Sequence, residues 1–343
     1  LGPLGAAQER VKVRGLEVPF GYRTKLSMAA GGRSGALRFG FYPRGSFGEP
    51  VPAEGCPVQH PLTLSTLALV RQALDATHVS PTNAKDPRSG WLHGVVVRVD
   101  PSRGASEITL VGRNERPPGR ATFAQQLAAL PGVDAVHIGV NPRRSSYALG
   151  ETFEHLAGAQ QMVFTLGGRS FRLSPGSFFQ TSHGGAELLA AAVLELLPPA
   201  MRCLADLYGG VGIFSRLSAG RWERAVVAEA NPSAVADLRA DLAGDPLPLR
   251  VIPGKVEQTI RRVLEANPDV ALLDPPRRGC QPAVLKALAD AAPEQVLYVA
   301  CGVEALRRDV GKLCRQGYRI DRVVAVDMFP HTPHLEVVCS LLR

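Results

Sequence analysis

Apolar runs and helix-like segments alternate through the second half of the chain. Residues 184–197 (GGAELLAAAVLELL) are mostly apolar and predict a helix, which stops at Pro198-Pro199. Short apolar runs rich in β-branched residues follow, with helix-like segments between them, which is the pattern of a parallel sheet. The predicted strands are residues 202–208, 224–229, 249–252, 270–274 and 295–300.

Two more strands are predicted at the C-terminus, residues 318–329 and 335–342. They are joined by only PHTPH (330–334), whereas parallel neighbours need a crossover of about a dozen residues. The last strand is therefore expected to run antiparallel. The predicted fold class is α/β: a doubly wound, Rossmann-like sheet with an antiparallel last strand.

The first half has a different pattern, with short strands separated by turns rich in Gly, Pro and Arg. Residues 91–100 and 105–113 are predicted as neighbouring strands, joined by the turn residues PSRG. Residues 122–141 predict a short helix followed by a strand. We therefore expect two domains: an α+β domain of residues 1–165 and the α/β domain of residues 166–343.

The positive charge of the chain is concentrated in its first half. The net charge is +8, and residues 1–170 carry 19 Lys and Arg against 12 Asp and Glu, whereas residues 171–343 carry 20 against 19. This asymmetry suggests that the first half binds a polyanion such as RNA, although an Arg-rich genome would give a similar excess. The candidate phosphate contacts are Arg23, Lys25, Arg143 and Arg144.

The composition also indicates where in the cell the protein is expected. No apolar run approaches the ~20 residues needed to span a bilayer, and no signal-peptide pattern opens the sequence. The six cysteines include no C-x-x-C pair, which favours a reducing compartment over a disulfide framework. We expect a cytoplasmic monomer with no membrane partner, in which most cysteines are small buried hydrophobes.

Polar residues collect where the predicted strands end. Ligands of an open α/β sheet bind at the carboxyl ends of its parallel strands. Those ends carry Asp206, Glu229, Asp274 and Cys301, and the start of the antiparallel last strand brings Glu336 to the same edge. Each residue alone could be a cap or a turn residue, but their convergence favours a site.

A glycine loop on this edge indicates a nucleotide-like cofactor. Gly210 and Gly212 follow a strand and open a helix, and Glu229 lies about 20 residues further on, where it suits a ribose hydroxyl pair. A dinucleotide site would have G-x-G-x-x-G, but Ser215 occupies the third glycine position, and Asp206 would repel a pyrophosphate. The pattern therefore favours S-adenosylmethionine (SAM), which has a ribose and a cationic sulfonium but no phosphate, over NAD.

The segment LLDPPRRG (272–279) follows another strand. Its two prolines predict a stiff turn that presents Asp274 to a planar base, and Arg277 favours a phosphate or a carbonyl-bearing pyrimidine as its partner. A polar loop with chance prolines is the alternative interpretation.

A thiol and a carboxylate on one edge suit a particular reaction. Carbon 5 of uracil is a poor nucleophile, but a thiolate that adds to carbon 6 makes carbon 5 able to attack a sulfonium methyl group. A base must then remove the proton from carbon 5. Cys301 is the candidate nucleophile and Glu336 the candidate base, and Arg277 is expected to favour the thiolate.

These motifs together resemble the RNA 5-methyluridine methyltransferases, the TrmA/RumA family. The resemblance is carried by SPGSFFQTS (174–182), DLYGGVGIF (206–214), Glu229, DPPRRG (274–279), Cys301 and DMFPHTPHLE (327–336). It implies a class I SAM-methyltransferase fold preceded by an RNA-binding α+β domain. The site residues that it implies are Gln180, Tyr208, Gly210, Gly212 and Glu229 at SAM, Asp274 facing cofactor and base, Phe179 and Arg277 at the substrate, Cys301 as nucleophile and Glu336 as base.

The same resemblance implies a substrate, and the sequence departs from the family's pattern at two places. DMFPHTPHLE and PRRGC are more similar to the 23S rRNA members, so 23S rRNA is the preferred substrate and tRNA the alternative. Gly302-Val303 stands where the family usually has Asn-Pro, which keeps open a catalytically weakened RNA-binding protein. Cys56-Pro57 is similar to the fourth ligand of an iron–sulfur cluster whose other ligands would precede Leu1, so we expect no cluster here.

Overall fold

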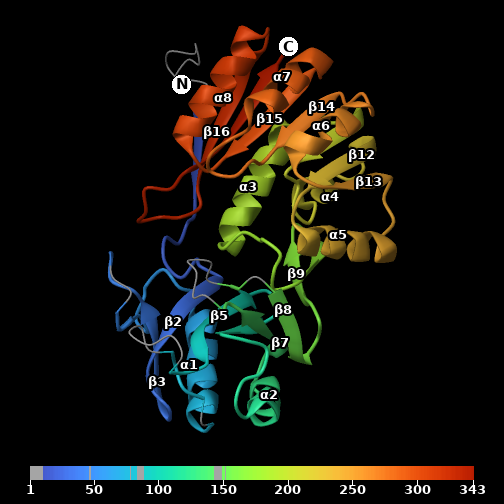
Figure 1. Ribbon diagram of the computed structural model, residues 1–343. Helices are drawn as coiled ribbons and strands as arrows, with labels where there is room; N and C mark the ends of the chain where they lie inside the picture. The colour runs from blue at the N-terminus through green and yellow to red at the C-terminus, as the bar shows by residue number, and fades with distance from the viewer. Residues whose placement is uncertain (1–10, 46–47, 78, 83–88, 143–148, 151) are drawn as a thin grey trace. The chain divides into compact units, whose positions relative to one another are not determined.

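The computed structural model describes residues 11–45, 48–77, 79–82, 89–142, 149–150 and 152–343 (Figure 1). The chain divides into two compact units. The α+β unit comprises Phe20–Thr165 and Arg172–Gly176. The α/β unit comprises Leu166–Phe171, Ser177–Arg343 and the described part of Leu1–Pro19. The division therefore differs from the single boundary after residue 165 that the sequence predicted, because short segments from each side belong to the other unit.

The α/β unit is built on an eight-stranded sheet in the order β1-β16-β17-β15-β14-β11-β12-β13. The strands predicted in the second half are all present, and β11 to β15 pair in parallel. Helices separate them along the chain, as a doubly wound sheet requires. The strands are β1 (Val11–Gly15), β11 (Met201–Leu207), β12 (Trp222–Glu229), β13 (Leu249–Pro253), β14 (Val270–Leu273), β15 (Gln295–Ala300), β16 (Arg319–Asp327) and β17 (Glu336–Leu342).

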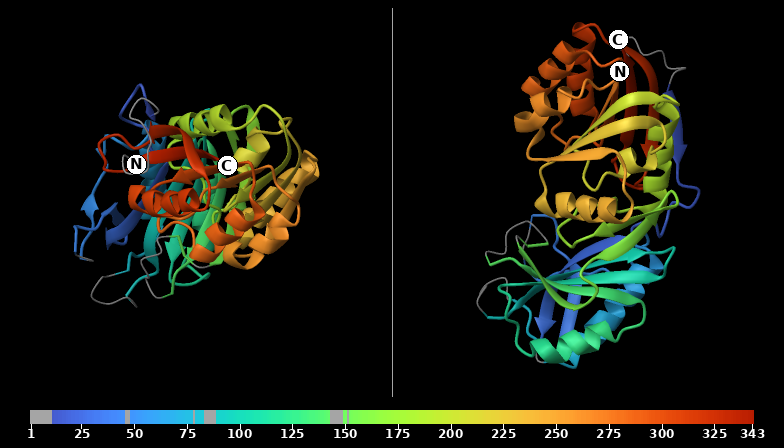
Figure 2. Two further views of the ribbon diagram at one scale, coloured as in Figure 1. Left: turned by 90° about the horizontal axis from the view of Figure 1, so that it is seen from above. Right: turned by 90° about the vertical axis from the view of Figure 1, so that its right-hand side faces the viewer.

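Helices cover both faces of this sheet. In the right-hand view of Figure 2 the orange helices α7 and α8 and the yellow-green helix α3 lie on opposite sides of it. Residues of α6, α7 and α8 form one core cluster with the sheet, to which α3, α4 and α5 contribute nothing. Because both faces are covered, all six residues of β15 are buried. The helices are α3 (His183–Leu196), α4 (Ile213–Leu217), α5 (Pro232–Gly244), α6 (Val256–Leu264), α7 (Pro282–Ala291) and α8 (Val303–Arg315).

The last strand runs antiparallel, as the short join before it predicts. β17 lies between β15 and β16 and is antiparallel to both. Its first residue therefore lies at the edge where the neighbouring strands end.

One strand of this sheet comes from the beginning of the chain. β1 pairs in parallel with β16, with Val11 opposite Val323 and Gly15 opposite Asp327. Lys12 and Arg14 on β1 also form ion pairs with Glu195 near the end of α3. These five residues alternate apolar and basic side chains, a pattern too short for sequence analysis to pair them with a strand more than 300 positions later.

The α+β unit contains a seven-stranded sheet in the order β4-β3-β2-β5-β6-β7-β8. β5 and β6 form the hairpin that the sequence predicted, and α2 precedes β7 as expected. The 15-residue helix α1 was not anticipated; its apolar face packs into the core with Leu67, Val70 and Leu74. The elements are β2 (Lys25–Arg33), β3 (Ala36–Phe41), β4 (Val51–Pro52), α1 (Pro61–Asp75), β5 (Leu92–Asp100), β6 (Ala105–Gly112), α2 (Arg120–Ala128), β7 (Val133–Val140) and β8 (Thr152–Gly158).

A separate two-stranded sheet, β9 (Met162–Leu166) and β10 (Arg169–Leu173), completes the strands of the described chain. Each of its strands belongs partly to one unit and partly to the other. No helix in the described part of the chain is long and apolar enough to cross a membrane.

Candidate active site

Antiparallel pairing brings a thiol and a carboxylate together at the carboxyl edge of the α/β sheet. Ala300, the last residue of β15, is paired with Val337 of β17. The next residue along the chain, Cys301, therefore comes opposite Glu336. Directly opposed residues of antiparallel strands have Cβ atoms about 4.5–5.5 Å apart. The charge of Glu336 also affects the pKa of Cys301, which agrees with this proximity.

Four carboxylates share this edge: Asp206, Glu229, Asp274 and Glu336, here called the rim carboxylates. Glu336 is only 7% exposed, and burial raises its pKa to about 7. The pKa of Asp274 is raised to about 8, first by burial and then by the negative charges of the other three. The site therefore holds protons at neutral pH that exposed carboxylates would have lost.

Asp206 lies deepest in this group. Its side chain is wholly buried, and burial raises its pKa to about 7. The backbone N–H of Ser215 donates to Oδ2 at 3.3 Å, whereas Oδ1 has no hydrogen-bond partner among the described residues. An unpaired buried carboxylate oxygen beside a glycine loop suits a donor or a cation brought by a ligand.

The glycine loop lies next to Asp206 and faces open space. Gly210 and Gly212 have φ of 57° and 74°, which favours glycine, and a Cβ on Gly210 would meet no atom within 4 Å. The Gly210 N–H donates to Glu229 Oε2 at 2.9 Å, and the Asn231 N–H donates to Oε1 at 2.6 Å. These bonds hold the Glu229 carboxylate at the loop with lone pairs left for ribose hydroxyls. The loop, Glu229 and the unpaired Asp206 oxygen fit SAM.

Tyr208 precedes the glycine loop and shapes it by its backbone conformation. Its φ of 61° is left-handed, and its ring packs against the core cluster on the α6–α8 face. Burial raises the pKa of its hydroxyl, with a further contribution from Cys280. Its contribution to the loop is therefore the left-handed turn rather than an exposed hydroxyl.

Cys301 is partly buried and less acidic than the sequence suggested. Burial raises the pKa of its thiol, and the charges of Glu336 and Asp274 raise it further. Arg277 lowers it, but this effect is smaller than the other three. Arg277 thus favours the thiolate, as expected, but burial and two carboxylates outweigh one exposed guanidinium, so the pKa of the thiol is raised overall.

Arg277 itself is exposed and lies beside a residue that sequence analysis missed. Its Nη2 donates to Nδ1 of His334 at 3.4 Å. His334 belongs to the PHTPH join, two residues before Glu336. The polar composition of that join was the available signal, but only the antiparallel strand order brings it to Arg277.

The segment before α3 places its two phenylalanines differently from expectation. Phe179, expected at the substrate, is 4% exposed, and its ring centroid lies 6.0 Å from that of Phe171. Phe178 is 59% exposed and is therefore the ring that a base could contact. Gln180 is partly buried and lies two residues before Ser182, whose Oγ caps α3. The motif alone could not separate two adjacent phenylalanines, since only the packing decides which one faces the core.

The basic candidates of the first half are not free surface charges. Lys25 lies opposite Arg98 in the sheet, and burial, followed by the charge of Arg98, lowers its pKa to about 8. Arg23 is partly buried, and its backbone is bonded to Val58 and His60. Both side chains are therefore partly buried, and their role as phosphate contacts stays a prediction. Arg143 and Arg144 lie outside the described residues.

The six cysteines of the chain are all unpaired. Cys56 lies in a turn in which its N–H donates to the carbonyl of Ala53. Among the residues that the structure describes, no group of three His, Cys, Asp or Glu could hold a metal ion.

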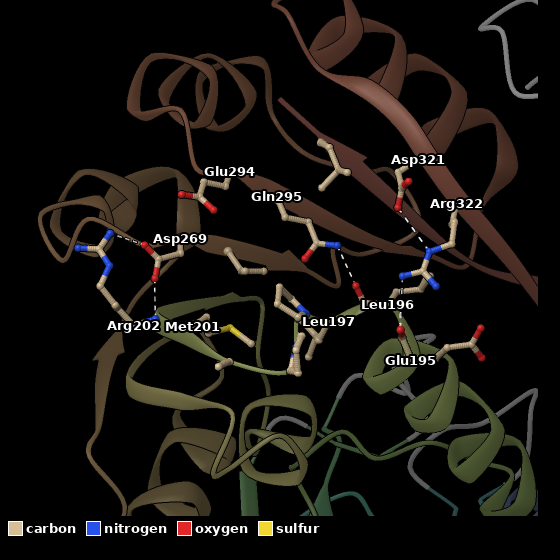
Figure 3. A pocket seen from close by; sticks show the side chains of 15 residues that line it. Glu195, Leu196, Leu197, Met201, Arg202, Asp269, Glu294, Gln295, Asp321 and Arg322 are labelled. Carbon is tan, nitrogen blue, oxygen red and sulfur yellow. Dashed lines mark hydrogen bonds and ion pairs between the residues drawn. The ribbon is translucent and has the colours of Figure 1, made fainter.

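A cavity of about 580 Å³ opens at the opposite edge of the sheet (Figure 3). Its lining includes Met201, Val270 and Gln295, which lie at the beginnings of parallel strands. The rim carboxylates and Cys301 lie at the other ends of those strands. This cavity is therefore separate from the candidate site.

Comparison with known proteins identifies RNA methyltransferases as relatives of this chain. The family model for tRNA (uracil-5-)-methyltransferase matches residues 262–343, which include Asp274, Cys301 and Glu336. Relatives similar over most of the chain include an uncharacterized RNA methyltransferase of Thermosynechococcus vestitus, 32% identical over 94% of this chain and 72% of its own length. Another, from Bacillus cereus, is 32% identical over 96% of this chain and 72% of its own length.

A solved structure is similar over nearly the whole chain. It is the tRNA (uracil-54, C5)-methyltransferase of Pyrococcus abyssi in complex with S-adenosyl-L-homocysteine. The TM-score is 0.82 and the identity 26%, over 97% of this chain and 79% of that one.

The raised pKa of Glu336 predicts a pH-dependent effect of Glu336→Gln on stability. A carboxyl group with a native pKa of about 7 holds its proton longer than the unfolded chain does, so stability falls as pH rises from about 4.5 to 7. Glutamine does not ionise, so the variant does not lose stability in this way as pH rises. We expect thermal denaturation to show little difference from wild type near pH 4.5 and a gain on the order of 3 kcal/mol at pH 8. Glu265→Gln, at an exposed position, is the control, and an identical pH profile for both variants would contradict the prediction.

The start of α8 predicts how the chain tolerates the family's usual residues. Gly302, the N-cap, makes no side-chain cap bond, and a Cβ there would lie 3.1 Å from the carbonyl oxygen of Arg277. Val303 is the first helical residue and is 49% exposed, so Val303→Pro should change the free energy of unfolding by less than about 0.5 kcal/mol. Gly302→Asn should gain only a few tenths of a kcal/mol, offset by the contact with Arg277. Urea denaturation measures both, and a loss above about 1 kcal/mol for Val303→Pro would exclude this helix start.

Proposed function

Because the chain belongs to the family of SAM-dependent RNA uracil-5-methyltransferases, we propose that it methylates carbon 5 of a specific uridine in 23S rRNA through a covalent adduct with Cys301. One observation carries the proposal: the pairing of Ala300 with Val337, which brings Cys301 opposite Glu336 at the edge that also holds the glycine loop. A nucleophile, a base and a cofactor loop on one edge are what this reaction requires.

Each rim residue has a role in the proposed reaction. The Cys301 thiolate forms a bond to carbon 6 of uracil, and the electron pair moves to carbon 5. SAM supplies the methyl group that carbon 5 takes. Glu336 then removes the proton from carbon 5, the double bond between carbons 5 and 6 forms again, and the bond to sulfur breaks. A carboxylate with a pKa of about 7 is well matched to this proton transfer near neutral pH.

The remaining residues bind the two substrates in this proposal. Glu229 accepts from the ribose hydroxyls of SAM, and the rim carboxylates as a group favour its cationic sulfonium over neutral ligands. Gln180, Tyr208, Gly210, Gly212 and Asp274 complete the cofactor site. Arg277 is exposed beside Cys301 and contacts the RNA, and Phe178 replaces Phe179 as the aromatic candidate at the base.

We assign RNA binding outside the site to the α+β unit, within a monomeric and cytoplasmic protein. The support is the excess of 6 positive charges in residues 20–165 and 172–176, from 16 Lys and Arg minus 10 Asp and Glu. Phosphate contacts release counterions, so this binding weakens as the salt concentration rises.

The choice of RNA has two candidates. DMFPHTPHLE and PRRGC favour 23S rRNA, as stated above. The similarity to the Pyrococcus abyssi enzyme, which is described as a tRNA methyltransferase, favours tRNA.

Methyl transfer from labelled SAM to separate 23S rRNA and tRNA transcripts tests the proposal. Wild-type protein should label 23S rRNA, and Cys301→Ala should bind SAM with wild-type affinity but label neither RNA. Cys314→Ala, a partly buried cysteine in α8, is the matched control and should label rRNA normally. Labelling of tRNA alone would transfer the assignment to the alternative. No labelling by wild type, with SAM and RNA still bound, would indicate a catalytically weakened RNA-binding protein.

Loss of Glu336 should stop the reaction after methyl transfer. Glu336→Gln keeps the early steps, but the proton on carbon 5 then has no acceptor, so the bond to Cys301 persists. Denaturing electrophoresis should show a protein–RNA band that carries label from SAM on ordinary uridine RNA, with turnover reduced about 10²–10⁴-fold. Normal turnover without a trapped band would assign Glu336 a purely structural role.

A further inference from the structure

A buried carboxylate behind the rim connects three segments near Cys301: the 274–280 loop, β15 and α8. Asp309, in α8, is wholly buried. Its Oδ2 accepts from the N–H of Cys280 at 2.8 Å and from the hydroxyl of Tyr298 at 2.8 Å. Its Oδ1 accepts from Nε of Arg308 at 2.8 Å.

Asp309 and its partners Cys280 and Tyr298 lie in three different segments of the chain. Cys280 ends the loop that begins at Asp274, and Tyr298 lies in β15, three residues before Cys301. Asp309 itself lies in the helix that begins two residues after Cys301. The carboxylate therefore ties the 274–280 loop to both segments that flank Cys301.

The loop is held closely against this carboxylate. Gly279 has φ of 79°, and a Cβ there would lie 2.4 Å from Asp309 Oδ2. Nη2 of Arg308 adds a second tie, to the carbonyl of Arg278 at 2.7 Å. Any side chain at position 279 would push the loop away, so glycine is required both by its backbone conformation and by the short distance.

Backbone N–H groups anchor the loop at each of its ends. The N–H of Asp274 donates to the carbonyl of Leu207 at 3.1 Å, and the N–H of Cys280 donates to Asp309. Between them the carbonyl of Arg277 lies against Gly302, beside Cys301. Release of the Asp309 anchor would therefore let Arg277 move, whereas Asp274 would stay held at Leu207.

We propose that Asp309 is a positioning residue whose carboxylate fixes the 274–280 loop, and with it Arg277, against Cys301. The proposal rests on the proposed function only for its effect on methylation. Loss of this charge weakens the bonds that Cys280 and Tyr298 donate, so Asp309→Asn is expected to lower thermal stability as well as to release the loop. Burial keeps both neighbours neutral, since it raises the pKa of Tyr298 and raises that of Cys280 to about 12.

Asp309→Asn tests the proposal, with Asp269→Asn as the matched control. Like Asp309, Asp269 holds backbone in place: it accepts the N–H groups of Arg202 at 2.6 Å and Cys203 at 3.1 Å, but at the opposite edge of the sheet. Alkylation of each cysteine by iodoacetamide at pH 8 is followed by peptide mass spectrometry in the free protein. Arg277 lowers the pKa of Cys301, although its effect is smaller than those of burial and the two carboxylates, so its displacement should slow alkylation of Cys301 in Asp309→Asn relative to wild type. Cys314 serves as the internal standard and should react at an unchanged rate.

Methyl transfer gives the second measurement. Asp309→Asn should lower kcat for RNA methylation about tenfold or more, while Asp269→Asn should retain wild-type kcat despite a similar loss of thermal stability. Equal alkylation and equal kcat in the two variants would overturn the proposal, because Asp309 would then have only a structural role.

The alkylation experiment also decides the role of Asp309 if the variant does not fold or if the wild-type protein methylates no RNA. If Asp309→Asn does not fold, Arg308→Gln removes the tie to Arg278 from a partly exposed position, and wild-type alkylation of Cys301 in it would overturn the proposal. If wild-type protein methylates no RNA, the proposed function fails, but the alkylation rates of the free protein still decide the role of Asp309.

Discussion

The position of the last strand is the constraint on which the site depends. β17 runs antiparallel between two strands that point the other way, so its first residue lies where its neighbours end. Without this reversal Glu336 would lie at the far edge of the sheet, a strand length from Cys301. The short PHTPH join makes the reversal necessary, because it cannot span the sheet to start a parallel strand.

The same geometry creates an electrostatic problem. Four carboxylates and a thiol lie on one edge with few cations beside them, and three of the carboxyl groups have their pKa raised to about 7 or 8. An arrangement of this kind opposes folding above neutral pH and is relieved by a bound cation. The sulfonium of SAM is such a cation, so the edge is better suited to the charged methyl donor than to its neutral product.

Support for the reactive residues comes from behind the edge. The glycine loop is tied to Glu229, Asp274 to the end of β11, and the far end of its loop to Asp309. These bonds come from backbone N–H groups, which hold a loop in place without occupying the space that substrates need. The side chains of the candidate site and the backbone groups that hold its loops are thus contributed by different residues of the same segments.

Much of this arrangement could be read from local sequence. The strand ends, the glycine loop and the direction of β17 follow from periodicity and from the length of one join, since these depend on neighbouring residues. Tertiary structure alone decided that β1 joins the eight-stranded sheet, that Phe178 rather than Phe179 is exposed, and that Lys25 is partly buried with a lowered pKa. It also decided that the pKa of Cys301 is raised and that Asp309 lies beneath the 274–280 loop. Burial and charge at a residue are sums over neighbours from distant parts of the chain, and no local pattern contains them.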